Sequence, residues 1–309
     1  MPADLYNRAL TLALANDEGT QVTPRSGRFE LPFGVLDVDM DLSELRVGGY
    51  ALDQFTPVAD LEITGLAMRY RRPGLGAPLA ASLKPADPDK APRDFLPPEL
   101  HLAVTMLLQI PDARRVLVQG GTLAGRLDVF LADEPETITS GGERVPLEVE
   151  PTAALAYSLA QIPVLEREVR HFVGLTTPNR TGETLATTAP HRPGLIPVVF
   201  IHGTFSSAVR WAEMVNRLEA DPEIRRGYQF WFFSYDSSNP IAYSALQLRR
   251  LLTAALTKLD PVGTDPSLAR MVLIGHSQGG LLAKMLTVDS GDKIWGRVSD
   301  VPFLRVGVS

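Results

Sequence analysis

The feature that most constrains the fold of this chain is a strand, a tight turn and a helix in immediate succession around Ser277. Residues 271–274 are apolar and typical of a buried β-strand, and residues 275–280 read Gly-His-Ser-Gln-Gly-Gly. A helix-forming stretch follows without a break. Gly275 and Gly279 leave room for a sharp bend that lifts the Ser277 hydroxyl above the end of the strand. The pattern predicts that Ser277 is a nucleophile within reach of a base.

The residues from Pro197 onward alternate between strand-like and helix-like patterns. The expected strands are 197–202, 228–235 and 270–275, and the expected helices are 208–218, 240–259 and 279–288. Residues 198–201 are apolar on both faces, as in parallel strands that helices cover on each side. We therefore expect an α/β fold with a doubly wound, mostly parallel sheet that is incomplete at its C-terminal side.

Three stretches of the chain differ in pattern. Of the 25 prolines, 19 lie before residue 195, and residues 1–150 alternate short apolar runs with turn residues, which predicts a β-rich N-terminal domain. Residues 151–195 are expected to form a helical segment and linker, with a helix at 164–172 and a surface connection over 176–194. Residues 196–309 are expected to form the partial α/β domain.

A basic cluster of Arg69, Arg71 and Arg72 lies in the first of these stretches. Such a cluster fits an anionic partner or a contact between domains. The simplest expectation is a solvent-facing strand edge, because charged side chains commonly protect such edges from pairing with other chains.

The composition excludes several functions. Cysteine is absent, which removes disulfides, iron–sulfur clusters, thiolate zinc sites and cysteine nucleophiles. A formal charge of −6 makes nucleic acid an unfavourable partner. No apolar run reaches the roughly 18 to 20 residues of a transmembrane helix, and the first residues lack the features of a secretory signal. We expect a cytoplasmic location for the chain as written, and the cell envelope for a chain whose natural N-terminus lies further upstream.

No cofactor or metal is expected. Asp37, Asp39 and Asp41 have the spacing that opens a calcium loop, but Leu42 stands where that loop needs glycine and no glutamate closes it. The three aspartates are therefore interpreted as the solvated face of a strand.

A second motif follows the strand at 198–201. Residues 202–207 read His-Gly-Thr-Phe-Ser-Ser, a strand end followed by small polar residues and then a helix. Attack on an ester carbonyl places negative charge on oxygen, which two fixed N–H donors stabilise by a few kcal/mol. The candidate donors are the amides of Thr204 and Gln278, with Phe205 as the alternative to Thr204.

At these two motifs the chain resembles the α/β-hydrolase superfamily, in particular its bacterial lipase and esterase branch and the GPI inositol-deacylase-like proteins. The matching residues are His202-Gly203-Thr204-Phe205 and Gly275-His276-Ser277-Gln278-Gly279-Gly280, and the resemblance spans residues 197–288. It implies a serine hydrolase that acts on small-molecule or lipid carboxylic esters through an acyl-enzyme, without a cofactor. It also implies an oxyanion hole at Thr204 and Gln278, with His202 and His276 in structural roles.

The chain departs from the superfamily in one respect. There the nucleophile is followed along the chain by an acid and then by a histidine. None of the five histidines follows Ser277: they are His101, His171, His191, His202 and His276. The later acids are Asp289, Asp292 and Asp300, and residues 302–309 look like the start of one more strand. We therefore expect a C-terminally truncated chain that lacks the acid and the base and hydrolyses esters negligibly.

Two further hypotheses follow from the missing base. An upstream histidine, His191 or His171, could swing toward Ser277. Alternatively, the fold could serve as a non-catalytic interaction or scaffold module.

Overall fold

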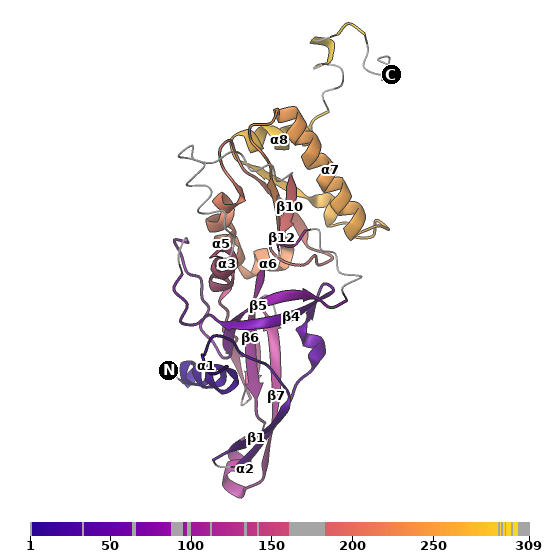
Figure 1. Cartoon of the computed structure of the whole chain (residues 1–309). Helices are drawn as coiled ribbons and strands as arrows, with labels where there is room; N and C mark the ends of the chain where they lie inside the picture. The colour runs from indigo at the N-terminus through magenta and orange to yellow at the C-terminus, as the bar shows by residue number, and fades with distance from the viewer. Residues whose placement is uncertain are drawn as a thin grey trace.

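The structure is a computed structural model of the 309-residue chain. It describes residues 2–32, 34–63, 66–87, 95–97, 100–111, 113–132, 135–140, 142–160, 183–289, 291, 293, 295–297 and 299–301. Figure 1 shows an elongated molecule in which a β-rich part and an α/β part follow one another along the long axis.

The N-terminal part is built on a seven-stranded sheet with the order β1-β2-β7-β6-β5-β4-β3. Its strands are β1 (Gly27–Leu31), β2 (Gly34–Asp39), β3 (Arg46–Val47), β4 (Tyr50–Pro57), β5 (Ala77–Pro85), β6 (His101–Gln109) and β7 (Thr122–Leu131). Neighbouring strands are antiparallel except for β2 and β7, which are parallel. The smaller elements of this part are η1 (Leu42–Leu45), α2 (Ala113–Gln119), β8 (Thr137–Ser140) and β9 (Glu143–Pro146).

Two helices pack on opposite faces of this sheet. Helix α1 (Pro2–Leu14) inserts Leu10 into a core that contains Leu79 from β5. Helix α3 (Pro151–Ala160) packs Ala153 and Ala154 against Ala80, the next residue of the same strand. Successive residues of a strand point to opposite faces, so β5 is apolar on both sides because both sides are covered.

The second sheet has the order β10-β12-β11-β13. Its strands are β10 (Thr184–Thr187), β11 (Ile196–Ile201), β12 (Tyr228–Ser234) and β13 (Val272–Gly275). Strand β11 is parallel to both β12 and β13, whereas β10 is antiparallel to β12. The expectation of a surface connection over 176–194 is wrong for residues 184–187, which form β10. The described fold is thus α/β with mixed sheets.

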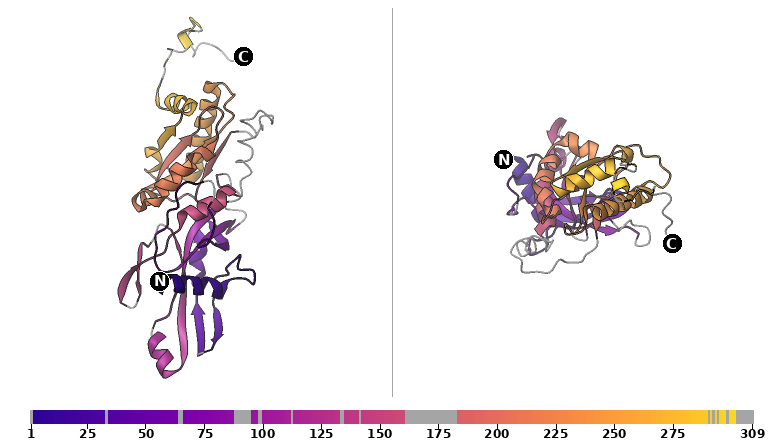
Figure 2. Two further views of the ribbon diagram at one scale, coloured as in Figure 1. Left: turned by 90° about the vertical axis from the view of Figure 1, so that its left-hand side faces the viewer. Right: turned by 90° about the horizontal axis from the view of Figure 1, so that it is seen from above.

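Helices cover both faces of the second sheet (Figure 2). They are η2 (Ala208–Trp211), α5 (Ala212–Ala220), α6 (Pro222–Gly227), α7 (Ile241–Leu259), η3 (Leu268–Arg270) and α8 (Gln278–Thr287), and η4 (Trp295–Arg297) follows. Helices α7 and α8 pack on the face that carries Val199 and Trp231, and α5 and α6 pack on the face that carries Phe200 and Phe230. This double cover explains why β11 is apolar on both faces.

The arginine cluster is not a solvent-facing strand edge, so that expectation is wrong. The Nε of Arg71 lies 2.5 Å from Oε1 of Glu148 and 3.6 Å from Oε2 of Glu150, and the Nε of Arg69 lies 3.1 Å from Oε1 of Glu150. Both carboxylate side chains are 1% exposed. A buried carboxylate needs a cation close by, so the arginines compensate two charges that the fold has removed from water.

The two parts of the molecule are joined through helix α5. Asn216, which is 1% exposed, accepts a hydrogen bond from Thr152 Oγ1 at 2.6 Å and donates one to the Met68 carbonyl at 2.8 Å. The Glu213 carboxylate accepts from the Ala67 amide at 2.8 Å. One face of α5 therefore packs on the second sheet while these polar side chains bind the N-terminal part.

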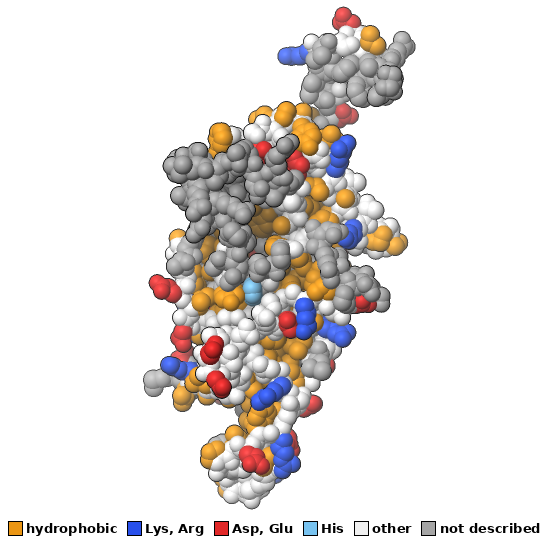
Figure 3. All heavy atoms as spheres, viewed as in Figure 1, with side chains coloured by type: hydrophobic (Ala, Val, Ile, Leu, Met, Phe, Trp, Pro, Cys, Tyr) orange, Lys and Arg blue, Asp and Glu red, His pale blue; other side chains and the backbone are white. Residues whose placement is uncertain are grey.

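Figure 3 shows one face of the molecule. Among its described residues, basic and acidic side chains are interspersed and lie between apolar ones. None of the helices among the described residues combines the length and the apolarity needed to cross a bilayer.

Candidate active site

Ser277 occupies the bend between β13 and α8. Its backbone angles are φ 53° and ψ −121°, and only one other described residue that is not glycine, Phe205, has a positive φ. Such a conformation costs about 1–3 kcal/mol and persists only where the surroundings enforce it. The Ser277 side chain is exposed. The strand and helix therefore hold a serine hydroxyl at the surface in a strained turn, as the sequence predicts.

Three glycines make this bend sterically possible. A Cβ atom at Gly279 would lie 2.2 Å from the carbonyl oxygen of Ile201, and one at Gly275 would lie 2.4 Å from the carbonyl group of Gly279. A Cβ atom at Gly203 would lie 3.0 Å from the Cβ of Ser277. The bend after β13 and the loop after β11 are therefore in direct contact.

The loop after β11 brings backbone amides beside the serine. The Phe205 N–H donates to Ser237 Oγ at 3.0 Å, so this amide is already engaged. The N–H groups of Thr204 and Gln278 have no hydrogen-bond partner in the described part of the chain. Gln278 is also the first residue of the ten-residue helix α8, where the helix dipole favours a negative charge. Thr204 and Gln278 thus each present an amide that no described residue engages.

His202 is buried beneath this loop. Its Nδ1 lies 2.9 Å from the Gly203 carbonyl oxygen, to which it donates, and its Nε2 accepts from the Tyr235 N–H at 3.4 Å. Burial lowers the pKa of His202, which keeps the ring neutral. The Gly203 carbonyl and the Thr204 N–H belong to one peptide plane. The hydrogen bond from His202 therefore restrains one side of the peptide group that carries this N–H.

Tyr235 completes the support of the loop. Its ring stacks on His202 with centroids 4.4 Å apart, and its hydroxyl donates to the His202 carbonyl oxygen at 2.9 Å. Burial raises the pKa of Tyr235 to about 12, so the hydroxyl stays protonated and able to donate.

No histidine of the described residues forms a hydrogen bond with Ser277. His276 is exposed beside the serine, and His101 lies on β6, where it contacts the Tyr157 ring edge-on. The Nδ1 of His191 lies 3.1 Å from Oε1 of Gln229, at the start of β12 and thus at the opposite end of the sheet. The hypothesis that His191 acts as the base is therefore wrong for this structure. His171 lies outside the described residues.

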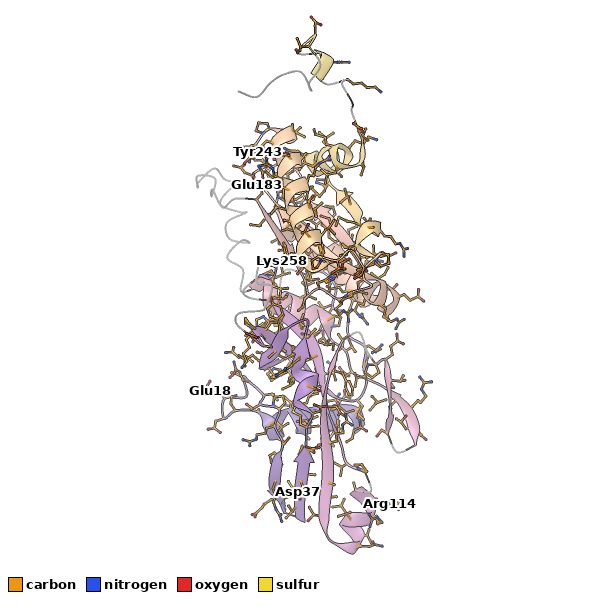
Figure 4. The ribbon with its side chains drawn as sticks, turned by 90° about the vertical axis from the view of Figure 1, so that its right-hand side faces the viewer. Glu18, Asp37, Arg114, Glu183, Tyr243 and Lys258 are labelled. Atoms are coloured by element: carbon orange, nitrogen blue, oxygen red, sulfur yellow. The ribbon has the colours of Figure 1, made fainter. Side chains whose placement is uncertain are left out.

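The site faces away from the N-terminal part. Figure 4 shows Glu183 and Tyr243, which lie by the carboxyl end of β12, at the far end of the α/β part, while Asp37 and Arg114 mark the other end of the molecule. The described N-terminal sheet therefore does not line the approach to Ser277.

Sequence reasoning missed one residue of this region, Ser237. It follows β12, which is parallel to β11, and its hydroxyl reaches the loop after β11. The carboxyl ends of parallel strands meet at one edge of a sheet. The polar residues 236–239, which follow the expected strand 228–235, could therefore have been predicted to lie beside the Ser277 loop.

One family model matches the α/β part of the chain. Residues 192–299 match the family model of the PGAP1-like alpha/beta domain. The match spans β11 through α8 and includes both glycine motifs. It is an α/β-hydrolase-like family, which supports the expected superfamily over about a third of the chain. No curated protein and no solved structure matches the chain significantly.

Among the described residues, no three histidine, aspartate or glutamate side chains gather as metal ligands do.

Proposed function

We propose that this chain carries the nucleophile and the oxyanion hole of a serine hydrolase that acts on carboxylic esters, of the lipase and esterase type. The single observation that carries the proposal is the exposed Ser277, held at φ 53° at the end of a strand beside two amides to which no described residue bonds. The family match over residues 192–299 supports a hydrolase-type fold. We extend it to a doubly wound, mostly parallel sheet of the bacterial lipase kind.

The proposed reaction proceeds through an acyl-enzyme. Ser277 Oγ attacks the ester carbonyl carbon while a base removes its proton, and the carbonyl oxygen becomes an oxyanion. The amides of Thr204 and Gln278 donate to that oxygen, and each such donor is worth roughly 10²–10³ in rate. The intermediate expels the alcohol, which takes up the proton, and water then hydrolyses the acyl-serine by the same route.

The base is the part of this mechanism that the described residues do not supply. A serine without its histidine retains only the catalysis that binding and the oxyanion hole provide. We therefore expect negligible ester hydrolysis by the purified 309-residue chain, measured as release of 4-nitrophenol from 4-nitrophenyl butyrate. Robust turnover would show that a base is present after all.

Covalent labelling tests the nucleophile directly. We expect a fluorophosphonate to modify the chain slowly at Ser277, and we expect added imidazole to accelerate the modification because it replaces the missing base. Intact-mass measurement and peptide mapping give the rate and the site. Ser277→Ala should abolish the modification, whereas Ser238→Ala, on the exposed loop after β12, should not.

The outcomes separate the two functions. Labelling that depends on both imidazole and Ser277 supports the hydrolase. If Ser277 stays unmodified at saturating imidazole and probe, the hydrolase proposal is rejected in favour of the non-catalytic scaffold module.

A further inference from the structure

The three loops at the carboxyl ends of β11, β12 and β13 are joined by a closed set of hydrogen bonds. Thr204 Oγ1 donates to Gln278 Oε1 at 2.7 Å, and Gln278 Nε2 donates to the Ser237 carbonyl oxygen at 3.3 Å. Ser237 Oγ in turn accepts from the Phe205 N–H at 3.0 Å. Because Thr204 and Phe205 are adjacent, the circuit closes on itself.

This circuit contains both candidate oxyanion donors. The Thr204 amide lies on the loop after β11 and the Gln278 amide begins α8, so nothing in the chain connectivity fixes the distance between them. The Gln278 side chain, buried at 8% exposure, spans from Thr204 to Ser237 and bridges all three loops. The bridge adds a side-chain link between the two donors to the backbone contacts that join β11 and β13.

The backbone of Phe205 has an unfavourable conformation that a hydrogen bond must stabilise. Its φ is 50° and its side chain is 93% exposed, so it gains little from packing, while the left-handed backbone costs about 1–2 kcal/mol. The hydrogen bond to Ser237 Oγ is the one that the Phe205 amide makes in the described structure. Without it, residue 205 can relax toward an ordinary φ, which rotates the peptide groups of the loop.

We propose that Ser237 is a positioning residue for the oxyanion hole, acting through the Phe205 amide to hold the Thr204 N–H in its working direction. The inference rests on the proposed function of Ser277. In the described structure Ser237 forms no hydrogen bond with Ser277, and its hydroxyl accepts from the Phe205 N–H. The structure also assigns the donor role to Thr204 over Phe205, because Ser237 occupies the Phe205 amide.

The matched variants are Ser237→Ala, Ser237→Thr and Ser238→Ala. The first removes the acceptor, the second keeps a hydroxyl at the same position, and the third removes the neighbouring hydroxyl, which donates to Asp236 at 2.6 Å instead. We expect Ser237→Ala to lower the maximal fluorophosphonate labelling rate of Ser277, with imidazole present, by about 10–100-fold, since a displacement of about 1 Å costs up to ~10² in rate. The probe concentration at half-maximal rate should not change.

Ser237→Thr should restore the rate and Ser238→Ala should leave it unchanged. Equal maximal rates for wild type and Ser237→Ala would overturn the inference while leaving the proposed function intact. A wild-type chain that is never labelled rejects the proposed function instead.

Amide hydrogen exchange tests the hydrogen bond between the Phe205 N–H and Ser237 Oγ without any chemical reaction at Ser277. Exchange of the Phe205 amide, which donates to Ser237 Oγ, should become faster in Ser237→Ala and stay at the wild-type rate in Ser237→Thr and Ser238→Ala. Unchanged exchange in Ser237→Ala overturns the inference even if labelling is slow for other reasons.

Discussion

Replacing Gly279 with alanine is expected to destabilise the α/β part by about 3 kcal/mol, the upper end for inserting an atom into a packed site. The added Cβ would lie 2.2 Å from the Ile201 carbonyl oxygen and 2.6 Å from that of His202. Both contacts are to backbone, which cannot rotate away as a side chain can. To avoid them, α8 must separate from β11, which opens the bend at Ser277. Urea unfolding gives the free energy of unfolding.

Gly280 supplies the matched control for this prediction. It is the next residue of α8, and a Cβ there would have its nearest neighbour, the Gly275 carbonyl oxygen, at 3.5 Å. That is an ordinary contact, so Gly280→Ala should raise the free energy of unfolding by up to about 1 kcal/mol through helix propensity. If both substitutions change stability alike, the close approach of α8 to β11 is not what requires glycine.

Replacing Arg71 with methionine is expected to lower the free energy of unfolding by about 3–5 kcal/mol. The substitution keeps most of the apolar stem but removes the cation 2.5 Å from Glu148 and one of the two cations beside Glu150, and both glutamate side chains are 1% exposed. The exposed pair of Lys84 and Asp53 gives the control, because Lys84→Met should cost less than about 1 kcal/mol. Similar losses from both substitutions would contradict the role assigned to Arg71.

The same variant should respond to pH in a defined direction. Burial raises the pKa of Glu150 above its ordinary value in the folded protein. The folded state then binds a proton more tightly than the unfolded state, so stability falls as the pH rises through the interval between the ordinary and the raised pKa. The charge of Arg71 lowers the pKa of Glu150, so the loss of Arg71 raises that pKa further and widens the interval. The difference between Arg71→Met and wild type should therefore shrink when unfolding is measured at mildly acidic instead of neutral pH.

The parts of the fold that could be predicted are those in which local pattern and tertiary environment agree. Residues 198–201 are apolar on both faces because helices cover both faces. Gly275 and Gly279 are required because a Cβ at either position would lie 2.2–2.4 Å from backbone atoms. In each case the residues of one short stretch of sequence are enough to predict the local structure.

The parts that could not be predicted depend on partners far away along the chain. Thr184–Thr187 is a strand only because β12 pairs with it, since four residues of mixed polarity carry little strand signal alone. Arg69 and Arg71 look like surface residues until the fold buries Glu148 and Glu150, about 80 positions later, against them. Ser237 matters through an amide 32 positions away. The periodicity of apolar residues along a short stretch of sequence carries no information about such distant contacts.

The way α5 joins the two parts bears on how such a protein can diversify. Asn216 is almost completely enclosed and has both ends of its amide committed to residues of the N-terminal part. Excising that part would expose the amide to water, and a different part in its place would have to supply a donor and an acceptor at the positions of Thr152 and Met68. The surfaces of the two parts are thus coupled at this joint, and a change on one side requires a matching change on the other.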